Sequence, residues 1–452
     1  MTAAAALGDF AASIRFADAD AAVQDRVRWI VADLLAAIVG GAAEPEMRAL
    51  AQARADGGPC TVPGLGLRMD AESAALANGT AGTFLEMDEG NRFARGHAGV
   101  HVMPAALAWC EAHGGDAGTF LGAVLAGYEV CSRIAAHSRL RPEFHQHGTW
   151  GTFGAAVAAG HAAGVSGAQQ GELIGIASSL MTATSKRTML EGGLVRNVYA
   201  GLANRNGLLA LQLLQAGFSA EHDGLRSQFA TLLSDSWDEA ALLASLRRDA
   251  GFQWHVLQNY FKLHSCCRYN HATLDALDLL AERGELPPAD DVERVDVTTY
   301  DLAAELSDPK PRNTLAARFS VPFAVATRLV RGSSGVASFS WDAVRDGSVL
   351  ALAARVAVRA DPAMSRRLPA ERPAKVAVHL RDGRSFSAEV GANRGDEQLP
   401  YTEAELRGKF AELARRLWPA AHAERTLDAT LSLGRGTSMP DWLALLREPP
   451  LR

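Results

Sequence analysis

The chain has 452 residues, with 45 Lys and Arg against 51 Asp and Glu, a net charge of −6, and 48% hydrophobic residues. This composition, with only 21% charged residues, is typical of a folded globular chain and excludes an intrinsically disordered one. The mild negative charge also argues against a nucleic-acid or anionic-membrane surface, because such binders need clustered Lys and Arg. We therefore expect no nucleic-acid and no membrane partner.

The amino-terminal residues and the cysteines favour a cytoplasmic protein. Acidic residues stand where a secretory signal carries its basic region, and no uninterrupted apolar run follows. The most apolar stretch, residues 29–41, contains Asp33 and is shorter than the roughly 20 residues that cross a bilayer. The five cysteines lack the spacing of a disulfide scaffold. We expect a soluble cytoplasmic protein with free thiols.

Apolar residues recur at helical spacing through the first 265 residues or so. Between residues 23 and 38 they form one stripe that would pack against other helices. Segments 104–110, 120–134 and 151–164 keep this period and are rich in Ala and Gly, which lets helix axes approach closely. The pattern predicts a tightly packed all-helical domain, whose Ala-rich start is expected to fray.

The composition changes after a helical segment at 273–282, which is followed by Gly284 and two prolines. Alternating apolar residues then predict strands near 292–297 and 355–359, and a hairpin over 375–390 that turns at Asp382-Gly383. Helical periodicity appears at 322–330 and returns at 402–418. We therefore predict a mainly α fold with two parts: a large all-helical domain of residues 1–270 and 400–452, and a smaller α+β lid domain of residues 271–399.

Common nucleotide and zinc motifs are absent from the sequence, including the P-loop, the dinucleotide fingerprint, HExxH and paired CxxC. One group of possible metal ligands is His264, Cys266, Cys267 and His271. Zinc sites usually combine ligand pairs from two separate arms, and adjacent cysteines rarely chelate one ion. Buried thiols beside polar histidines are the favoured interpretation, so we expect no metal and no cofactor.

Residues 78–104 form a Gly-rich connection between apolar helices that concentrates acids and histidines. These residues are Glu86, Asp88, Glu89, His97 and His101. A loop of this kind can present side chains to a cavity. Composition alone favours a solvated loop, whereas the low overall charge of the chain makes this density of charge conspicuous.

A second group of candidate residues is the pair His145 and His147, which precedes Gly148, Gly151 and an Ala/Gly-rich helix. The helix dipole disfavours a protonated imidazole at the amino terminus of a helix. This position suits a neutral base or a hydrogen-bond donor. A helix-capping or surface histidine is the alternative.

Two basic residues complete the candidates. Only five of the 45 basic residues are lysines, so the chain uses Arg wherever a generic cation serves. Lys262 has apolar and aromatic neighbours, and loss of hydration there would lower its pKa and make it an acid/base group or a carboxylate partner; snorkelling to solvent is the alternative. Arg196, near Tyr199, can clamp a carboxylate through two parallel hydrogen bonds, unless it forms a surface ion pair.

Taken together, these segments resemble the MmgE/PrpD family, which includes 2-methylcitrate dehydratase, cis-aconitate decarboxylase and iminodisuccinate epimerase. The resemblance extends over nearly the whole chain, through VADLLAAIVGG, NGTAG…DEG…GHAGVHVMPAALA, GYEVCSRI, FHQHGTWGTFGAAVAAG, FKLHSCCRYNH and ARFSVPFAVA. It implies a large all-helical domain with a smaller α+β lid, a homodimer, and a cleft between the domains. That cleft would hold a small di- or tricarboxylate without a metal or an organic cofactor.

The resemblance also implies the site residues. Asp88 matches the aspartate in the family's loop, and His97 matches the histidine that follows it. His145 matches the family's histidine before the Thr-x-Gly turn, and Lys262 matches its lysine before the Cys…His segment. With the segments above, the catalytic residues are expected to be His97, His145, Lys262, Asp88 and Tyr199. The substrate-binding residues are expected to be Arg196, Thr149, Asn91 and His271.

The chain departs from the dehydratase and decarboxylase members of the family at several positions. Those members often have other residues where this chain has Thr83, Glu89, Ala98, Arg196, Tyr199 and Phe323. The chemistry common to the family is a carbanion next to a carboxylate, which requires a base, an acid and stabilising cations. We expect a cofactor-independent, dehydratase-like hydro-lyase, with an epimerase, isomerase or decarboxylase as the alternative and a helical interaction scaffold as the non-enzymatic one.

We expect either His145 or Lys262 to move the proton in this reaction. Asp88 is expected to orient His97 or to hold a substrate hydroxyl.

Overall fold

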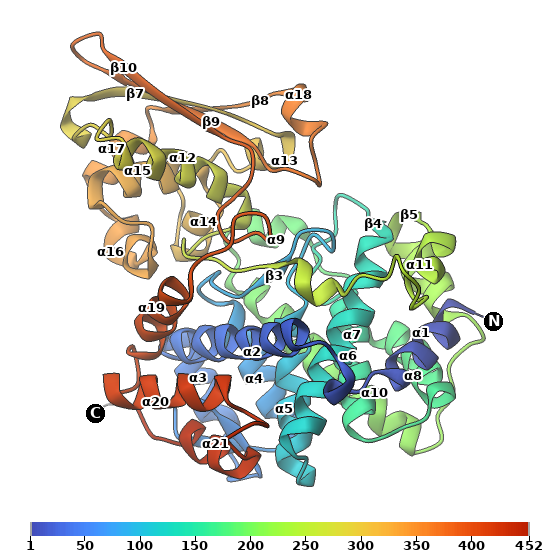
Figure 1. The fold of residues 1–452 in the computed structure, drawn as a ribbon. Coiled ribbons are helices and arrows are strands. Elements are labelled where there is room, and N and C mark those ends of the chain that lie inside the picture. The colour runs from blue at the N-terminus through green and yellow to red at the C-terminus, as the bar shows by residue number, and fades with distance from the viewer. Residues whose placement is uncertain (1, 451–452) are drawn as a thin grey trace.

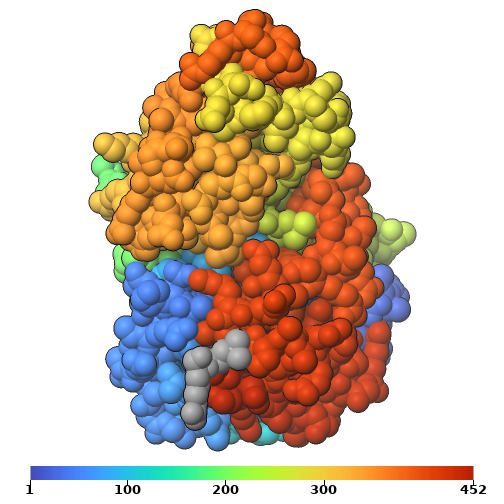
Figure 2. Space-filling view, turned by 90° about the vertical axis from the view of Figure 1, so that its left-hand side faces the viewer, coloured from blue at the N-terminus to red at the C-terminus, as the bar shows by residue number. Residues whose placement is uncertain are grey.

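The computed structural model describes residues 2–450 of the chain. Figure 1 shows two parts: a helical body, here residues 2–270 and 400–450, and an α+β unit, here residues 271–399. In Figure 2, the yellow and orange α+β unit rests on a body whose visible face is largely blue and red. The mainly α fold is confirmed, while the exact boundaries of the two parts and a lid function for the smaller one stay predictions.

The helical body begins with a long series of helices. They are α1 (Ala3–Ser13), α2 (Ala21–Ala42), α3 (Pro45–Arg54), α4 (Ala71–Thr83), α5 (Met103–His113), α6 (Ala117–Ala136), α7 (Gly151–Ala162), α8 (Gly167–Leu180), α9 (Lys186–Leu190), α10 (Val198–Gln215) and α11 (Glu239–Ser245). The tail returns to this body as α19 (Glu403–Ala414), α20 (Ala420–Leu431) and α21 (Met439–Leu446). The predicted helices at 23–38, 104–110, 120–134 and 151–164 lie within α2, α5, α6 and α7.

Small residues bring the helices of the body into backbone contact, as predicted. A Cβ added at Gly127 of α6 would lie 2.5 Å from the carbonyl oxygen of Gly154 in α7. The expectation that the Ala-rich start frays is wrong. Helix α1 is buried along one side and packs on α8, because Ala3, Ala4 and Leu7 find apolar partners there.

The α+β unit contains a four-stranded sheet in the order β10-β9-β7-β8, in which only the β7–β8 pair is parallel. The strands are β7 (Val292–Thr299), β8 (Val356–Ala360), β9 (Ala374–Leu380) and β10 (Ser385–Val390). Its helices are α12 (His271–Glu282), α13 (Asp301–Ala304), α14 (Thr314–Arg318), α15 (Val321–Arg331), α16 (Trp341–Val344), α17 (Gly347–Ala353) and α18 (Pro362–Ser365). The longer helices α12 and α15 lie between the sheet and the helical body (Figure 1). The predicted hairpin is confirmed, with Gly383 at a φ of +89° in its turn.

Three short strand pairs in the helical body were not predicted, because two- to four-residue strands carry no readable periodicity. They are β1 (Cys60–Val62) with β2 (Leu67–Met69), β3 (Gly90–Asn91) with β6 (Asn259–Tyr260), and β4 (Ser138–Leu140) with β5 (Ser234–Trp237). The β3–β6 pair positions the candidate site, because it joins the acidic loop after α4 to the segment that carries Lys262.

Two separate hydrophobic cores stabilise the two parts. One joins residues from 3–261 with residues from 401–446, and the other joins Met189 with residues from 266–388. Residues 262–265 connect these cores, so Lys262 lies where the chain passes from one to the other. No helix among residues 2–450 has the length and hydropathy needed to cross a membrane.

Candidate active site

The β3–β6 pair brings Asp88 and Lys262 together from segments that are far apart in the sequence. Gly90 pairs directly with Tyr260, and a Cβ at Gly90 would lie 2.4 Å from the Tyr260 hydroxyl, so this close approach requires glycine. Asp88 lies two residues before Gly90 and Lys262 two residues after Tyr260. The Lys262 Nζ is consequently 3.6 Å from Asp88 Oδ1.

Lys262 is completely buried and paired with two carboxylates. Its Nζ donates to the Glu86 carbonyl at 3.0 Å and lies 3.7 Å from Glu86 Oε2. Burial disfavours the charged amine, but the carboxylates of Asp88 and Glu86 outweigh this effect and raise the pKa of Lys262 above its usual value. The expected lowering of its pKa is therefore wrong, as is snorkelling to solvent. Lys262 is a fixed cation.

Glu86 is a member of the cluster that the sequence analysis did not select. Its φ of +54° lies in the left-handed region, which is uncommon for a residue other than glycine and is often found at functional sites. This backbone turns the Glu86 carboxylate toward Lys262 and into an ion pair with Arg196. Arg196 is buried in the turn Leu194–Asn197, with its guanidinium 5.2 Å from the centre of the Phe319 ring, so it does not form a surface ion pair.

His97 and Asp88 form a carboxylate–imidazole pair. His97 Nδ1 is 2.8 Å from the Glu89 carbonyl oxygen and 3.0 Å from Asp88 Oδ2, and because both are acceptors Nδ1 carries the proton. Burial opposes ionisation of Asp88, but His97, Lys262 and Arg196 outweigh it and hold the pKa of this carboxyl below its usual value. Nε2 of His97 has no hydrogen-bond partner among residues 2–450. This geometry suits a general base whose acceptor atom is Nε2.

His145 is held neutral, with a nitrogen facing an N–H donor on each side. Its Nδ1 lies 3.0 Å from the His147 amide nitrogen, and its Nε2 lies 3.3 Å from Arg196 Nε. Burial and the charge of Arg196 lower the pKa of His145 well below its usual value. The helix dipole predicted this direction, but burial and Arg196 are the causes. The Arg196 Nε–H points at Nε2 and the His147 amide N–H points at Nδ1. Because a neutral imidazole has a single lone pair, only one of these two contacts is a hydrogen bond, and the other ring nitrogen carries the proton. The Tyr199 ring packs against this imidazole at 5.9 Å.

Three histidines surround His147, which was considered as a candidate beside His145 but was not among the predicted site residues. The centre of its ring lies 5.1 Å from that of His97 and 4.8 Å from those of both His101 and His145. Neither ring nitrogen of His147, nor Nε2 of His101, has a hydrogen-bond partner in the described part of the chain. The second histidine of the FHQH segment was the available signal for this residue.

Acid is expected to destabilise the fold through these buried histidines. Burial lowers the pKa of His101 to about 4 and holds those of His145, His147 and His271 well below their usual value. Below the ordinary histidine pKa of about 6.5, the unfolded chain binds protons that the folded chain excludes, so the free energy of unfolding falls as pH falls. The slope reaches up to about 1.4 kcal/mol per pH unit for each histidine.

Glu89 opposes this effect in part. Burial raises its pKa to about 8, so between roughly pH 4.3 and 8 the folded chain binds one proton more at this site than the unfolded chain. Burial also raises the pKa of Asp33 and Glu129, but buried histidines with a lowered pKa outnumber these three carboxyls, so the net effect of lowering the pH is expected to be destabilising. Urea unfolding at pH 7.0 and 5.5 measures the difference, and equal stabilities at the two values would contradict the burial of neutral histidines.

Three predicted substrate-binding residues satisfy their hydrogen bonds within the protein. Asn91 binds the backbone of Phe93, Ala94 and His255. Thr149 Oγ1 donates to the Gln146 carbonyl at 2.5 Å. His271 lies between Arg268 and the Cys266 carbonyl. These contacts hold the loops around the cluster, and direct substrate contacts by Asn91, Thr149 and His271 stay predictions.

A second buried lysine supports the acidic loop from the other side. Lys409 of α19 lies 2.5 Å from Asp33 Oδ1 of α2 and donates to the Met87 carbonyl at 2.6 Å. Asp33 Oδ2 in turn accepts from the Glu89 amide at 2.9 Å. The scarcity of lysine that drew attention to Lys262 applied equally to Lys409. The carboxyl-terminal tail therefore helps to shape the site.

Replacing Lys409 with methionine is expected to lower the free energy of unfolding by about 3–5 kcal/mol, because Asp33 is left buried without its cation. Arg407 lies on the same helix in partly exposed ion pairs with Glu403 and Asp428. Arg407→Met is the matched control and is expected to cost no more than about 1 kcal/mol. Urea unfolding compares the two variants, and equal losses would contradict the support assigned to Lys409.

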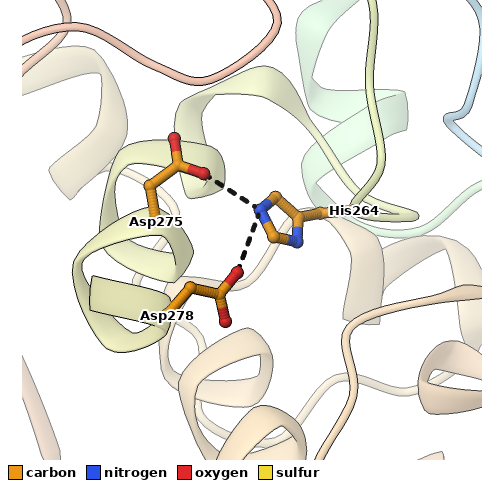
Figure 3. Close-up of side chains that lie close together, drawn as sticks. All are labelled: His264, Asp275 and Asp278. Carbon is orange, nitrogen blue, oxygen red and sulfur yellow. Dashed lines mark hydrogen bonds and ion pairs between the residues drawn. The ribbon is translucent and has the colours of Figure 1, made fainter. Parts of the chain in front are cut away.

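His264, which the sequence analysis considered beside Cys266, Cys267 and His271, instead faces two aspartates of α12 (Figure 3). Its Nε2 lies 3.2 Å from Asp275 Oδ1 and 4.0 Å from Asp278 Oδ2. Protein donors also bind these carboxylates: the Arg394 amide binds Asp275, and Arg328 Nε binds Asp278. The contacts of His264, Asp275 and Asp278 join the segment after Lys262 to α12 and α15. The expected absence of a metal stays a prediction.

A cavity of about 690 Å³ lies elsewhere, between the α5–α6 turn and the start of α21. None of the histidines, lysines or acids of the cluster lines it. The chemistry of the buried cluster, and not the size of this cavity, identifies the candidate site.

Comparison with known proteins identifies the family of the chain. The MmgE/PrpD N-terminal domain matches residues 5–233, and the MmgE/PrpD C-terminal domain matches residues 264–434. A cis-aconitate decarboxylase from Aspergillus terreus is 24% identical over 97% of this chain and 95% of its own length. The cis-aconitate decarboxylase-like protein oryM from Aspergillus oryzae is 23% identical over 98% of this chain and 96% of its own length. The two domain matches together span most of the sequence, and the chain belongs to the MmgE/PrpD family.

Proposed function

We propose that the protein is a cofactor-independent, dehydratase-like lyase that acts on a small di- or tricarboxylate or hydroxy acid. The reaction starts with removal of a proton from the carbon next to a carboxylate. One observation carries this proposal: the His97–Asp88 pair lies beside Lys262 and Arg196 in one buried cluster. Membership of a family that acts on small carboxylates supports it.

His97 is the proposed base, since its Nε2 lone pair is free while Nδ1 is held by Asp88 and the Glu89 carbonyl. Proton uptake at Nε2 forms an imidazolium that the Asp88 carboxylate stabilises. The negative charge that develops on the substrate carboxylate is stabilised by Lys262 and Arg196, and this attraction is strong because the buried cluster excludes water. This assignment differs from the expectation that His145 or Lys262 moves the proton.

His145 and Tyr199 are the proposed acid side of the site. Neutral His145 carries one ring N–H, and the adjacent Tyr199 offers a hydroxyl. In a dehydration, the leaving hydroxyl takes a proton from this side and departs as water. In the alternative reactions, decarboxylation delivers that proton to the carbon that loses carbon dioxide, and epimerisation returns a proton to the same carbon. The relatives named as decarboxylases favour decarboxylation among these alternatives, and the Tyr199–His145 pair favours epimerisation.

A thermal-shift screen with di- and tricarboxylates and hydroxy acids tests this function, because a ligand that binds the native state raises its stability. Compounds that raise the melting temperature are then incubated with the enzyme, and NMR of the products separates loss of water, loss of carbon dioxide and epimerisation. We expect at least one polycarboxylate to bind and to be converted. Absence of any shift would contradict the proposal. Homodimerisation and a cytoplasmic location stay predictions.

A further inference from the structure

Arg372 is a buried cation that the proposed mechanism does not use. It precedes β9 and is 4% exposed. Its Nη2 donates to the Arg92 carbonyl at 3.3 Å, but Nη1 has no hydrogen-bond partner. Among residues 2–450, no carboxylate forms an ion pair with Arg372 within 4.0 Å. A buried charge without a counter-ion is costly, so the position calls for an explanation.

Tyrosines surround this guanidinium. The Arg372 Cζ lies 5.5 Å from the ring centre of Tyr260 and 6.0 Å from that of Tyr269. The Tyr269 ring packs against Tyr300 at 5.7 Å, and the buried Tyr300 hydroxyl also has no hydrogen-bond partner in the described chain. Two unsatisfied donors, a guanidinium nitrogen and a phenol, therefore lie around one aromatic ring.

A second arginine adds to the positive charge. The Arg268 Cζ lies 4.4 Å from the centre of the Tyr260 ring. Arg268 pairs with Asp396 at 2.9 Å, yet its Nε has no partner among the described residues. Asp396 thus neutralises one of the two arginines. The Asp396 charge also raises the pKa of Arg372 from beyond ion-pair distance, but within 4.0 Å only Arg268 of the two arginines has a carboxylate partner in the described chain.

The ring of Tyr260 separates this group from the candidate active site. It packs edge-on against His97 at 6.3 Å, and Tyr260 lies two residues before Lys262. Arg372 comes from the α+β unit, whereas Tyr260 and His97 come from the helical body. The Arg372 guanidinium, which has no direct ion pair, therefore lies at the contact between the two parts, one aromatic ring away from the proposed base.

We propose that Arg372 and the Tyr300 hydroxyl form a second anion subsite, which binds the substrate carboxylate remote from the reacting carbon. The subsite rests on the proposed function and narrows its substrate class to acids with at least two carboxylates. The planar guanidinium can bind a carboxylate through two parallel hydrogen bonds, and the phenol adds a third donor. The competing explanation is that Arg372 is held by the tyrosine rings alone.

Tyr300→Phe separates these explanations because they predict different results. Removing a buried hydroxyl that lacks a partner leaves the free energy of unfolding unchanged or raises it. If the hydroxyl binds the remote carboxylate, the same variant weakens polycarboxylate binding by about tenfold, the cost of losing a hydrogen bond to a charged group. A purely structural tyrosine leaves affinity unchanged.

Arg372→Gln tests the guanidinium itself, and Arg384→Gln, an exposed arginine of the β9–β10 turn, is the matched control. Isothermal titration with tricarballylate, succinate and butyrate compares probes with three, two and one carboxylate. We expect Arg372→Gln to weaken tricarballylate and succinate binding at least about tenfold, to leave butyrate binding unchanged, and Arg384→Gln to match the wild type for all three.

The outcomes distinguish the subsite from the function on which it rests. If the wild type binds tricarballylate and both Arg372→Gln and Tyr300→Phe retain that affinity, the subsite is wrong while the proposed function stands. If no di- or tricarboxylate binds the wild type, both are wrong. Folding of Arg372→Gln is checked by circular dichroism. If Arg372→Gln does not fold, the affinity of Tyr300→Phe for tricarballylate decides whether the subsite exists.

Discussion

Replacing Lys262 with methionine is expected to lower turnover by about 10²- to 10³-fold, the usual effect of removing one group that stabilises a developing negative charge. The same change leaves the carboxylates of Glu86 and Asp88 buried without their shared cation. The free energy of unfolding is therefore expected to fall by about 3–5 kcal/mol. Urea unfolding and turnover of an identified substrate measure the two effects separately.

Adding Glu86→Gln to the Lys262→Met variant separates stability from catalysis. The second change removes one of the two buried negative charges and is expected to recover part of the lost stability. Turnover is not expected to recover, because no cation returns to the site. Near-full turnover of the folded Lys262→Met variant would contradict the role of Lys262, and recovery of turnover in the double variant would show that the loss was structural.

His97→Asn is expected to lower kcat by about 10²- to 10⁴-fold with a smaller change in KM, as expected for loss of a general base. An asparagine amide can still donate toward the Glu89 carbonyl and Asp88, but it has no atom equivalent to the free Nε2. The control is His113→Asn in the last turn of α5, where the exposed ring bonds only the Trp109 carbonyl. It is expected to change turnover by less than about twofold.

A parallel His145→Asn variant tests which histidine takes the proton. Loss of the His145 ring N–H on the acid side is also expected to slow the reaction, but not to stop the first proton transfer. If His145→Asn abolished that transfer while His97→Asn retained it, the assignment of His97 as the base would be wrong and the expectation drawn from the sequence would stand.

The secondary structure was largely readable from the sequence because it depends on local pattern. The apolar stripe of α2 and the Asp382-Gly383 turn each lie within one short segment, and the structure confirms both. The Ala and Gly content of α6 and α7 likewise predicted their close packing. The buried start of α1 was missed because its partner, α8, lies about 160 residues further along the chain.

The charge balance of the site was not readable, because it depends on distant segments. Apolar neighbours of Lys262 predicted desolvation correctly, but they could not show that Asp88 and Glu86 would reverse its effect on the pKa. The two-residue β3–β6 pair that makes this contact gives no pattern of its own. Glu86 was left among the scattered acids of its loop, since its pairing with Arg196 exists only in the folded chain. The pairing of Lys409 with Asp33 was missed for the same reason, because the two residues are far apart in the sequence.

Transfer of deuterium from solvent to the carbon next to a carboxylate measures directly whether His97 removes a proton there. Polycarboxylates that stabilise the protein are incubated with the wild type and with His97→Asn in heavy water and followed by proton NMR. We predict that the wild type incorporates deuterium at this carbon in at least one compound, and that His97→Asn does so at least about 100-fold more slowly. Conversion without any bond to hydrogen made or broken at that carbon, or equal exchange by His97→Asn, would contradict this prediction.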